Sequence, residues 1–208
     1  MILMNLLRKK KETITEIRKI REIDWMRKVL MVIDMQNDFT TGALGNKECA
    51  AVIPEVVKVI AEGDYDEVFL TRDTHGADYL NTQEGRKLPV IHTQKDTEGW
   101  QVVAEVVKAV ENKFHKENIT YIDKPTFGST KLQEMIKELA DQYETEGLTL
   151  DFVGVCTGIC VISNAIPAKM YAPEATIRVI PRACACVTPE SHKNAVEAMR
   201  TCQIDIVE

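Results

Sequence analysis

Short runs of apolar residues alternate along the chain with longer segments in which apolar residues recur every three or four positions. Continuous apolar runs are typical of strands buried on both faces of a parallel sheet, and the three- and four-residue spacing is typical of amphipathic helices. The pattern predicts strands at residues 28–34, 67–71, 119–122, 150–155, 176–180 and 203–207. It predicts helices at residues 50–62, 101–111, 130–143, 160–170 and 189–200.

The alternation of strands and helices indicates an α/β fold with three layers (αβα). Its centre is a doubly wound, six-stranded parallel sheet of Rossmann-like type, with helices on both faces. A length of 208 residues fits one domain. We expect this domain at residues 26–208. An N-terminal helical extension is expected at residues 1–25, where isoleucines repeat at a three-residue spacing.

Composition and charge limit the kinds of partner that we expect the protein to bind. The net charge is −6, and residues 1–28 hold nine Lys or Arg against four Asp or Glu, so the remaining chain is strongly acidic. An acidic surface does not favour nucleic acid, whose phosphates attract basic proteins. No apolar run reaches the length of about 18 residues that a membrane span needs. We therefore expect a cytoplasmic protein without nucleic-acid or membrane partners.

The six cysteines contain no CxxC pair, which disfavours a zinc ribbon or a thioredoxin-type site. Most are expected to be small core residues, and at least one a reactive thiol. Ligands of a doubly wound sheet bind outside the carboxyl ends of the strands. Asp34, Asp73, Lys124 and Cys156 stand at or directly after predicted strand ends, so ionisable and thiol groups are expected to meet at one edge.

Cys160 is the candidate nucleophile. It follows a predicted strand and a glycine-containing turn (Gly-Val-Cys-Thr-Gly-Ile-Cys), which places it near a helix N-terminus. The free N–H groups there favour a thiolate and can hold an oxyanion, so its pKa is expected below the usual ~8.5 of a thiol. Asp34 is the candidate base and Lys124 the candidate cation beside it. Position alone leaves open a structural cysteine, a turn aspartate and a solvated lysine.

Asp73, His75 and His92 form a second candidate set. One carboxylate and two imidazoles suit zinc, iron or manganese and leave positions for water and substrate, although this spacing alone is not diagnostic. His115 and His192 lie in polar helical segments and are expected on the surface.

Three segments together resemble the isochorismatase-like cysteine hydrolases, and within them the nicotinamidase branch. They are residues 34–39 (Asp-Met-Gln-Asn-Asp-Phe), 124–129 (Lys-Pro-Thr-Phe-Gly-Ser) and 154–161, which contain the Cys160 turn. They occur in the family's order, after the first, third and fourth predicted strands. The resemblance covers about residues 27–207.

The resemblance implies the isochorismatase-like hydrolase fold and a catalytic triad of Asp34, Lys124 and Cys160. It implies an oxyanion hole formed by the backbone N–H groups of Cys156 and Cys160. It also implies a non-proline cis peptide bond before Cys156.

The resemblance further implies that Asp73, His75 and His92 bind a divalent metal, zinc ahead of iron or manganese. The implied reaction is hydrolysis of a small amide through a thioester, with nicotinamide yielding nicotinate and ammonia. A homo-oligomer, a dimer or larger, is expected.

The substrate-contacting residues expected from the resemblance are Phe39, Leu88 and Ile159. Ile159 stands where nicotinamidases often carry His or another polar residue, and Leu88 where tryptophan is common. Asn81 and Glu84 stand near the position of a further histidine in some members. These departures concern the pocket wall and leave the choice of substrate open.

Two alternatives stay within hydrolases: cleavage of a carbamoyl amide, and cleavage of a vinyl ether as isochorismatases perform it. A third belongs to another class, a non-catalytic or redox-responsive binding protein in which Cys156 and Cys160 form a disulfide. That alternative leaves Asp34, Lys124 and the metal-type set without a role.

Overall fold

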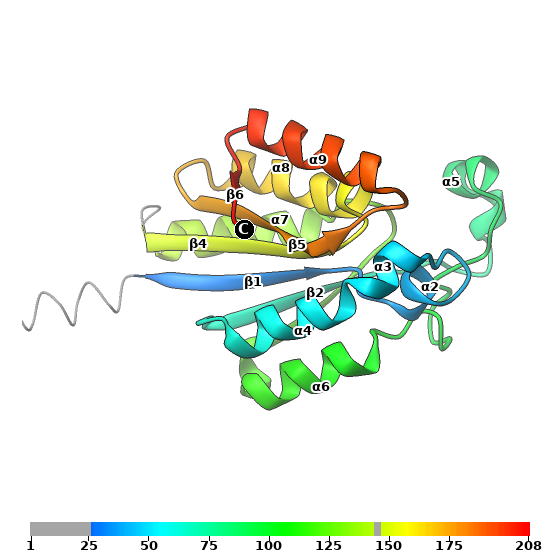
Figure 1. The fold of residues 1–208 in the computed structure, drawn as a ribbon, viewed down its shortest axis with the longest axis horizontal. Helices are drawn as coiled ribbons and strands as arrows, with labels where there is room; N and C mark the ends of the chain where they lie inside the picture. The colour runs from blue at the N-terminus through cyan, green and yellow to red at the C-terminus, as the bar shows by residue number, and fades with distance from the viewer. Residues whose placement is uncertain (1–25, 144–146) are drawn as a thin grey trace, which may run out of the picture.

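The computed structural model describes residues 26–143 and 147–208 (Figure 1). The predicted helical extension at residues 1–25 lies outside the described residues. The remainder forms a single parallel sheet covered by helices on both faces, as the alternating pattern predicts.

The six strands occur close to their predicted positions, and each hydrogen-bonded pair is parallel. Their order across the sheet is β3-β2-β1-β4-β5-β6. They are β1 (Arg27–Ile33), β2 (Glu67–Asp73), β3 (Ile119–Lys124), β4 (Leu148–Val155), β5 (Thr176–Ala185) and β6 (Asp205–Ile206). β5 continues beyond its apolar run, because a register shift opposite Phe152 and Gly154 keeps it paired with β4 past Pro181.

Helices cover the sheet in two groups, with α4 and α6 on one face and α7, α8 and α9 on the other (Figure 1). The α-helices are α2 (Asn37–Thr40), α3 (Lys47–Ala51), α4 (Ile53–Glu62), α5 (Gln83–Lys87), α6 (Ala104–Lys113), α7 (Thr130–Gln142), α8 (Ile162–Tyr171) and α9 (Pro189–Thr201). Shorter turns are η1 (Tyr79–Asn81), η2 (Lys116–Asn118) and the π-helical turn η4 (Thr157–Val161). None of the described helices is long and apolar enough to cross a membrane.

Two of the predicted helices are each divided. The helix expected at residues 50–62 consists of α3 and α4, with Pro54 in the first turn of α4, where its missing N–H is tolerated. The helix expected at residues 160–170 begins as η4 and continues as α8. Thr188 caps α9 by accepting the Ser191 N–H, and Pro189 follows at the first helical position, as predicted.

The apolar run in β1 does not alternate with polar residues, because each face of the strand packs into a hydrophobic core. Val29, Met31 and Ile33 pack into the core beneath α7, α8 and α9. Leu30 and Val32 pack into the second core beneath α4 and α6. Because both faces of the strand are buried from Val29 to Ile33, every position in this stretch is apolar.

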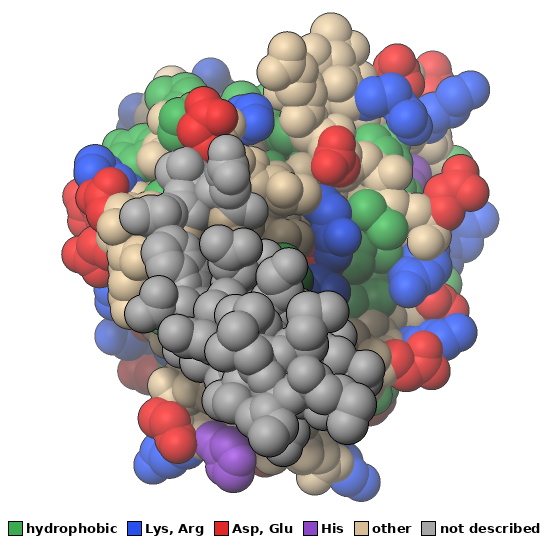
Figure 2. Space-filling model, turned by 90° about the vertical axis from the view of Figure 1, so that its left-hand side faces the viewer, with side chains coloured by type: hydrophobic (Ala, Val, Ile, Leu, Met, Phe, Trp, Pro, Cys, Tyr) green, Lys and Arg blue, Asp and Glu red, His purple; other side chains and the backbone are tan. Residues whose placement is uncertain are grey.

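All six strands run in one direction, so their carboxyl ends meet at one edge, toward the right in Figure 1. Figure 2 views the molecule from the opposite edge. On the part of that face not covered by grey atoms, acidic and basic side chains are interspersed rather than gathered by sign. The candidate chemistry is confined to the carboxyl edge, which carries β1, β2 and β3 side by side.

Candidate functional site

The Lys124 ammonium group, at the end of β3, is the centre of the site. Its Nζ lies 2.7 Å from Asp34 Oδ2, 3.3 Å from Asp73 Oδ1 and 3.8 Å from Cys160 Sγ. It also donates to the Thr126 carbonyl at 2.9 Å. Burial lowers the pKa of Lys124. The neighbouring Asp34, Cys160 and Asp73 together raise it by more, so the pKa lies above the ordinary value and the ammonium group stays charged. The sheet thus brings the three predicted triad residues together.

Asp34 follows β1 directly and is fully buried. Burial raises the pKa of its carboxyl group above the ordinary value, and the negative charge of Asp73 adds to this, whereas Lys124 and Thr71 oppose it. The Thr71 hydroxyl accepts the Asp34 N–H at 3.1 Å and donates to Asp34 Oδ1 at 2.6 Å. Asp34 Oδ2 lies beside Lys124 but has no hydrogen bond of regular geometry among the described residues. That oxygen is available to accept a proton.

The expected low pKa of Cys160 is wrong. The side chain is 5% exposed. Burial first, and then the negative charge of Asp34, raise the pKa of the thiol well above its ordinary value, although Lys124 acts in the opposite direction. Proximity to a helix N-terminus does not outweigh the removal of water and the adjacent carboxylate. Cys160 therefore rests as a thiol, and its sulfur could act as a nucleophile only after a base takes the proton.

The turn before Cys160 has the expected path from strand to helix. The Val155–Cys156 peptide bond is cis, as the resemblance implies. The Cys156 carbonyl accepts the N–H groups of Ile159 at 3.0 Å and Val161 at 3.1 Å, which closes the π-helical turn around Cys160. All six cysteines are free, and the oxyanion hole at the N–H groups of Cys156 and Cys160 stays a prediction.

His192 is only partly exposed, whereas a surface position was predicted. Its ring is half-buried, and its Nδ1 lies 2.8 Å from the hydroxyl of the fully buried Thr157 in η4. The polar helical context concealed this contact, because α9 packs against η4 only in the folded chain. His115 is exposed, as expected.

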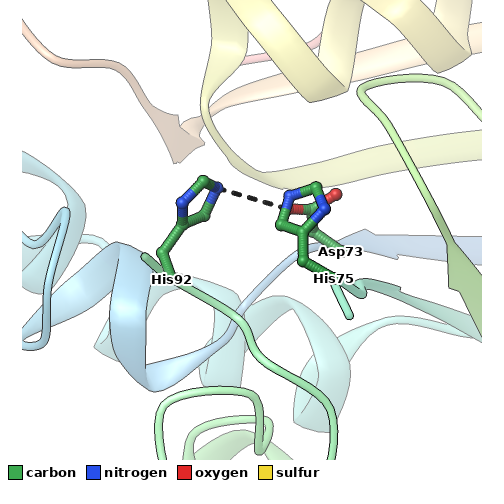
Figure 3. A group of neighbouring side chains, drawn as sticks. All are labelled: Asp73, His75 and His92. Atoms are coloured by element: carbon green, nitrogen blue, oxygen red, sulfur yellow. Dashed lines mark ion pairs between the residues drawn. The ribbon is translucent and has the colours of Figure 1, made fainter. Parts of the chain in front are cut away.

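Asp73, His75 and His92 converge beside this cluster (Figure 3). Asp73 ends β2, His75 follows it, and His92 comes from the loop after α5. The candidate ligand atoms all lie within 4.8 Å of one another. His75 Nε2 is 2.9 Å and His92 Nε2 is 3.6 Å from Asp73 Oδ2. Burial raises the pKa of Asp73, but the adjacent His75 and Lys124 lower it more, to about 2. The three residues that the sequence suggested as metal ligands therefore lie close together in the structure.

The donor atoms of this set fit a metal ion. His75 Nε2 is buried and has no hydrogen-bond partner of regular geometry among the described residues. His92 Nδ1 lies 2.7 Å from the Val90 carbonyl, so it carries the proton and leaves Nε2 as a free electron-pair donor. Glu84 Oε1, from α5, lies 3.7 Å from His75 Nε2 and brings a further oxygen near the set.

The three predicted substrate-contacting residues come from different parts of the chain: Phe39 lies in α2, Leu88 follows α5 and Ile159 lies in η4. The Phe39 ring centroid is 5.7 Å from that of His92. Leu88 is 37% exposed, and its carbonyl accepts the hydroxyl of Tyr79, whose ring lies 5.0 Å from that of His92. Ile159 is half-buried. Their contacts with a substrate stay predictions.

The sequence reasoning missed two buried polar residues that hold the site. Thr71 bonds Asp34, as described above. Gln36 Nε2 donates to the carbonyls of Asp73 at 2.9 Å and Trp100 at 2.8 Å, and its Oε1 accepts the Asp73 N–H at 2.8 Å. Gln36 lies within the segment that carried the resemblance, but nothing in the linear pattern indicates its partners.

Residues 28–208 match the family model of the isochorismatase domain. The chain belongs to the isochorismatase family. It is 29% identical over 174 residues to an uncharacterized isochorismatase family protein named PncA from Bacillus subtilis, covering 80% of this chain and 91% of that protein. Family membership confirms the predicted resemblance and, with the neighbours below, the predicted enzyme class, a hydrolase.

Solved structures share the fold of this isochorismatase-family chain. The crystal structure of nicotinamidase PncA from Bacillus subtilis matches with a TM-score of 0.71 at 27% identity, covering 88% of this chain and all of that one (100%). The pyrazinamidase of Pyrococcus horikoshii in complex with zinc matches with a TM-score of 0.68 at 24% identity, covering 88% and 99%. The predicted three-layer fold is confirmed.

Proposed function

We propose that this chain is a cysteine amidohydrolase that acts on a small amide through a thioester, with nicotinamide as the first substrate to test. The observation that carries the proposal is the position of Lys124, whose ammonium group lies within 3.8 Å of Cys160 Sγ and 2.7 Å of Asp34 Oδ2. A buried carboxylate, ammonium and thiol in mutual contact provide a base, a charge stabiliser and a nucleophile. The Bacillus subtilis protein whose solved structure shares this fold is a nicotinamidase.

In the first half-reaction, Asp34 takes the proton of the Cys160 thiol and the sulfur attacks the carbonyl carbon of the amide. Burial raises the pKa of the Asp34 carboxyl group, which makes it a stronger base, and the raised pKa of the Cys160 thiol is the reason that the sulfur needs this base. The backbone N–H groups of Cys156 and Cys160 hold the oxyanion. Protonated Asp34 then gives its proton to the leaving nitrogen, the C–N bond breaks and ammonia departs.

In the second half-reaction, Asp34 takes a proton from a water molecule, which attacks the thioester. The C–S bond breaks, the carboxylic acid is released and Cys160 regains its proton. Lys124 remains charged throughout and balances the negative charge that passes between Asp34 and the sulfur. Its contact with the Thr126 carbonyl keeps the ammonium group in place during both steps.

Asp73, His75 and His92 are proposed to hold a divalent metal, and Glu84 lies near enough to bring a further oxygen. When bound, the metal would supply a Lewis acid that orients the substrate through a ring nitrogen. Zinc is the ion to test first, because two imidazoles and a carboxylate suit it and a protein of the same fold was solved in complex with zinc. Iron and manganese are the alternatives.

Ammonia release from nicotinamide and pyrazinamide, measured with the full chain and added zinc, tests the proposal directly. Cys160→Ala should abolish turnover without unfolding the protein. Cys202→Ala is the matched control, because Cys202 is an exposed cysteine that follows directly after α9. Activity retained in Cys160→Ala would reject the nucleophile assignment.

The other hydrolase activities give different results in the same assay. A carbamoyl substrate that turns over while nicotinamide does not would move the assignment to that amide class. Turnover of a vinyl ether by metal-free protein would move it to the isochorismatase type. The cytoplasmic location and the homo-oligomeric state remain predictions, and analytical ultracentrifugation tests the second.

A further inference from the structure

Thr93 has a backbone conformation that its side chain disfavours. Its φ is +41°, in the left-handed region, and its side chain is β-branched and fully buried. Such a residue is a steric outlier, and the surrounding structure must hold it in place. Because Thr93 directly follows His92, this conformation sets the direction in which the His92 ring leaves the chain.

Three hydrogen bonds hold Thr93, and two of them lead to the other members of the metal-type set. Its carbonyl accepts the His75 N–H at 3.1 Å. Its hydroxyl donates to Asp73 Oδ2 at 3.0 Å. The third comes from outside the set, since the Thr93 N–H donates to Asp38 Oδ2 at 2.7 Å. Thr93 therefore connects all three candidate ligands to Asp38.

The Asp38 carboxylate sits in a space shaped by two glycines. A Cβ atom on Gly99 would lie 2.2 Å from Asp38 Oδ2, and one on Gly42 would lie 2.4 Å from Asp38 Oδ1. The Asp38 N–H also donates to the Gly99 carbonyl at 3.0 Å. These contacts leave the carboxylate little freedom to turn away from Thr93.

The site requires a carboxylate rather than an amide. Oδ2 accepts the Thr93 N–H at 2.7 Å, and Oδ1 accepts the Ala43 N–H at 3.1 Å. Asparagine has the same shape but only one acceptor, so its NH₂ group would face one of these two donors. Asp38→Asn therefore breaks one of the two contacts with almost no change in volume.

We propose that Asp38 is a positioning residue for the metal-type site, which holds the strained Thr93 backbone and thereby fixes His92 relative to His75 and Asp73. The inference rests on the proposed function only in that Asp73, His75 and His92 bind a divalent metal. Asp38 touches neither that metal nor the substrate. Its effect passes through Thr93, as outer-shell partners of metal ligands commonly act.

Co²⁺ binding to the full chain tests the inference without reference to turnover. Visible absorption of bound Co²⁺ reports its coordination, and competition with a chelator gives its affinity. Asp38→Asn should weaken Co²⁺ binding about 10- to 100-fold and alter the absorption bands. Gly99→Ala, which crowds the same carboxylate, should act in the same direction. Asp96→Asn is the control, because Asp96 is an exposed aspartate of the same loop.

A double-mutant cycle separates this role from general destabilisation. In Thr93→Gly protein the positive φ carries no penalty, so Asp38→Asn should weaken Co²⁺ binding less than it does beside threonine. Equal losses in both backgrounds would overturn the inference. So would unchanged Co²⁺ affinity and absorption in Asp38→Asn, even with a lowered melting temperature. A wild-type chain that binds no Co²⁺ would instead overturn the metal assignment in the proposed function, and this inference with it.

Discussion

Lys124 Nζ lies 3.3 Å from Asp73 Oδ1, so a single buried ammonium group connects Asp34 and Cys160 to the metal-type set of Asp73, His75 and His92. The two residues come from neighbouring strands: Asp73 ends β2, and Lys124 ends β3 at the paired position of the sheet. The same group pairs with Asp34 at the end of β1. One cation thus balances two buried carboxylates, and a change at any of the three groups alters the charge felt by the other two.

Asp34→Asn should lower kcat/KM for the amide at least about 100-fold, because an amide of the same shape cannot take the Cys160 proton. Steady-state ammonia release measures the loss. Asp123→Asn is the matched control: Asp123 lies near the carboxyl end of the neighbouring strand β3 but pairs with Arg72 at 2.7 Å on the exposed side of the strand. Comparable losses in both variants would contradict a specific role for Asp34.

Thr71→Val should shift the acid limb of the pH–rate profile to higher pH. The Thr71 hydroxyl donates to Asp34 Oδ1 at 2.6 Å, which stabilises the carboxylate and lowers the Asp34 pKa. Removing the hydroxyl raises that pKa, so Asp34 is ionised, and active as a base, only at higher pH. The profile of kcat/KM against pH measures this. A limb that stays in place or moves toward acid would show that Asp34 does not control it.

His75→Ala should lower zinc binding and, with it, amide hydrolysis. Its Nε2 is a buried donor atom without a regular hydrogen bond among the described residues, and its removal takes one of three close ligands from the set. Metal analysis of protein dialysed against zinc gives the occupancy. His115→Ala, at an exposed histidine, should bind as much zinc as the unchanged protein. Full occupancy in His75→Ala would reject this residue as a ligand.

Asp151→Ala should destabilise the fold without touching the site. Asp151, on β4, is 1% exposed and accepts two hydrogen bonds from Arg178, at 2.6 and 2.7 Å, and one from Tyr65 at 2.8 Å. Its removal leaves these donors unpaired, and the free energy of unfolding should fall by about 3 kcal/mol, as measured in urea.

The control for this change is Asp141→Ala, at an exposed ion pair with Lys137 in α7. Exposed pairs contribute less than about 1 kcal/mol, because water screens them. If the two variants unfold at the same urea concentration, the buried cluster at Asp151 does not stabilise the sheet as argued.

The sequence by itself determined the sheet and the identities of the candidate groups. Val29 to Ile33 are apolar without interruption because β1 is buried on both faces, and this made the parallel sheet predictable. In such sheets ligands bind at the carboxyl ends of the strands, and this rule predicted from the sequence that Asp34, Asp73 and Lys124 lie at one edge. Periodicity also placed α7 and α9, whose amphipathic patterns are long enough to be distinctive.

Only the tertiary structure decided how these groups affect one another. The direction of the Cys160 pKa shift depends on nearly complete burial and on Asp34, which is distant in sequence, so the helix-terminus argument predicted the wrong sign. Thr71, Gln36 and His192 act through contacts between separate elements, and no local pattern marks them. The linear order of residues specifies which groups reach the edge of the sheet, whereas their charges and hydrogen bonds depend on distances that exist only once the strands are paired.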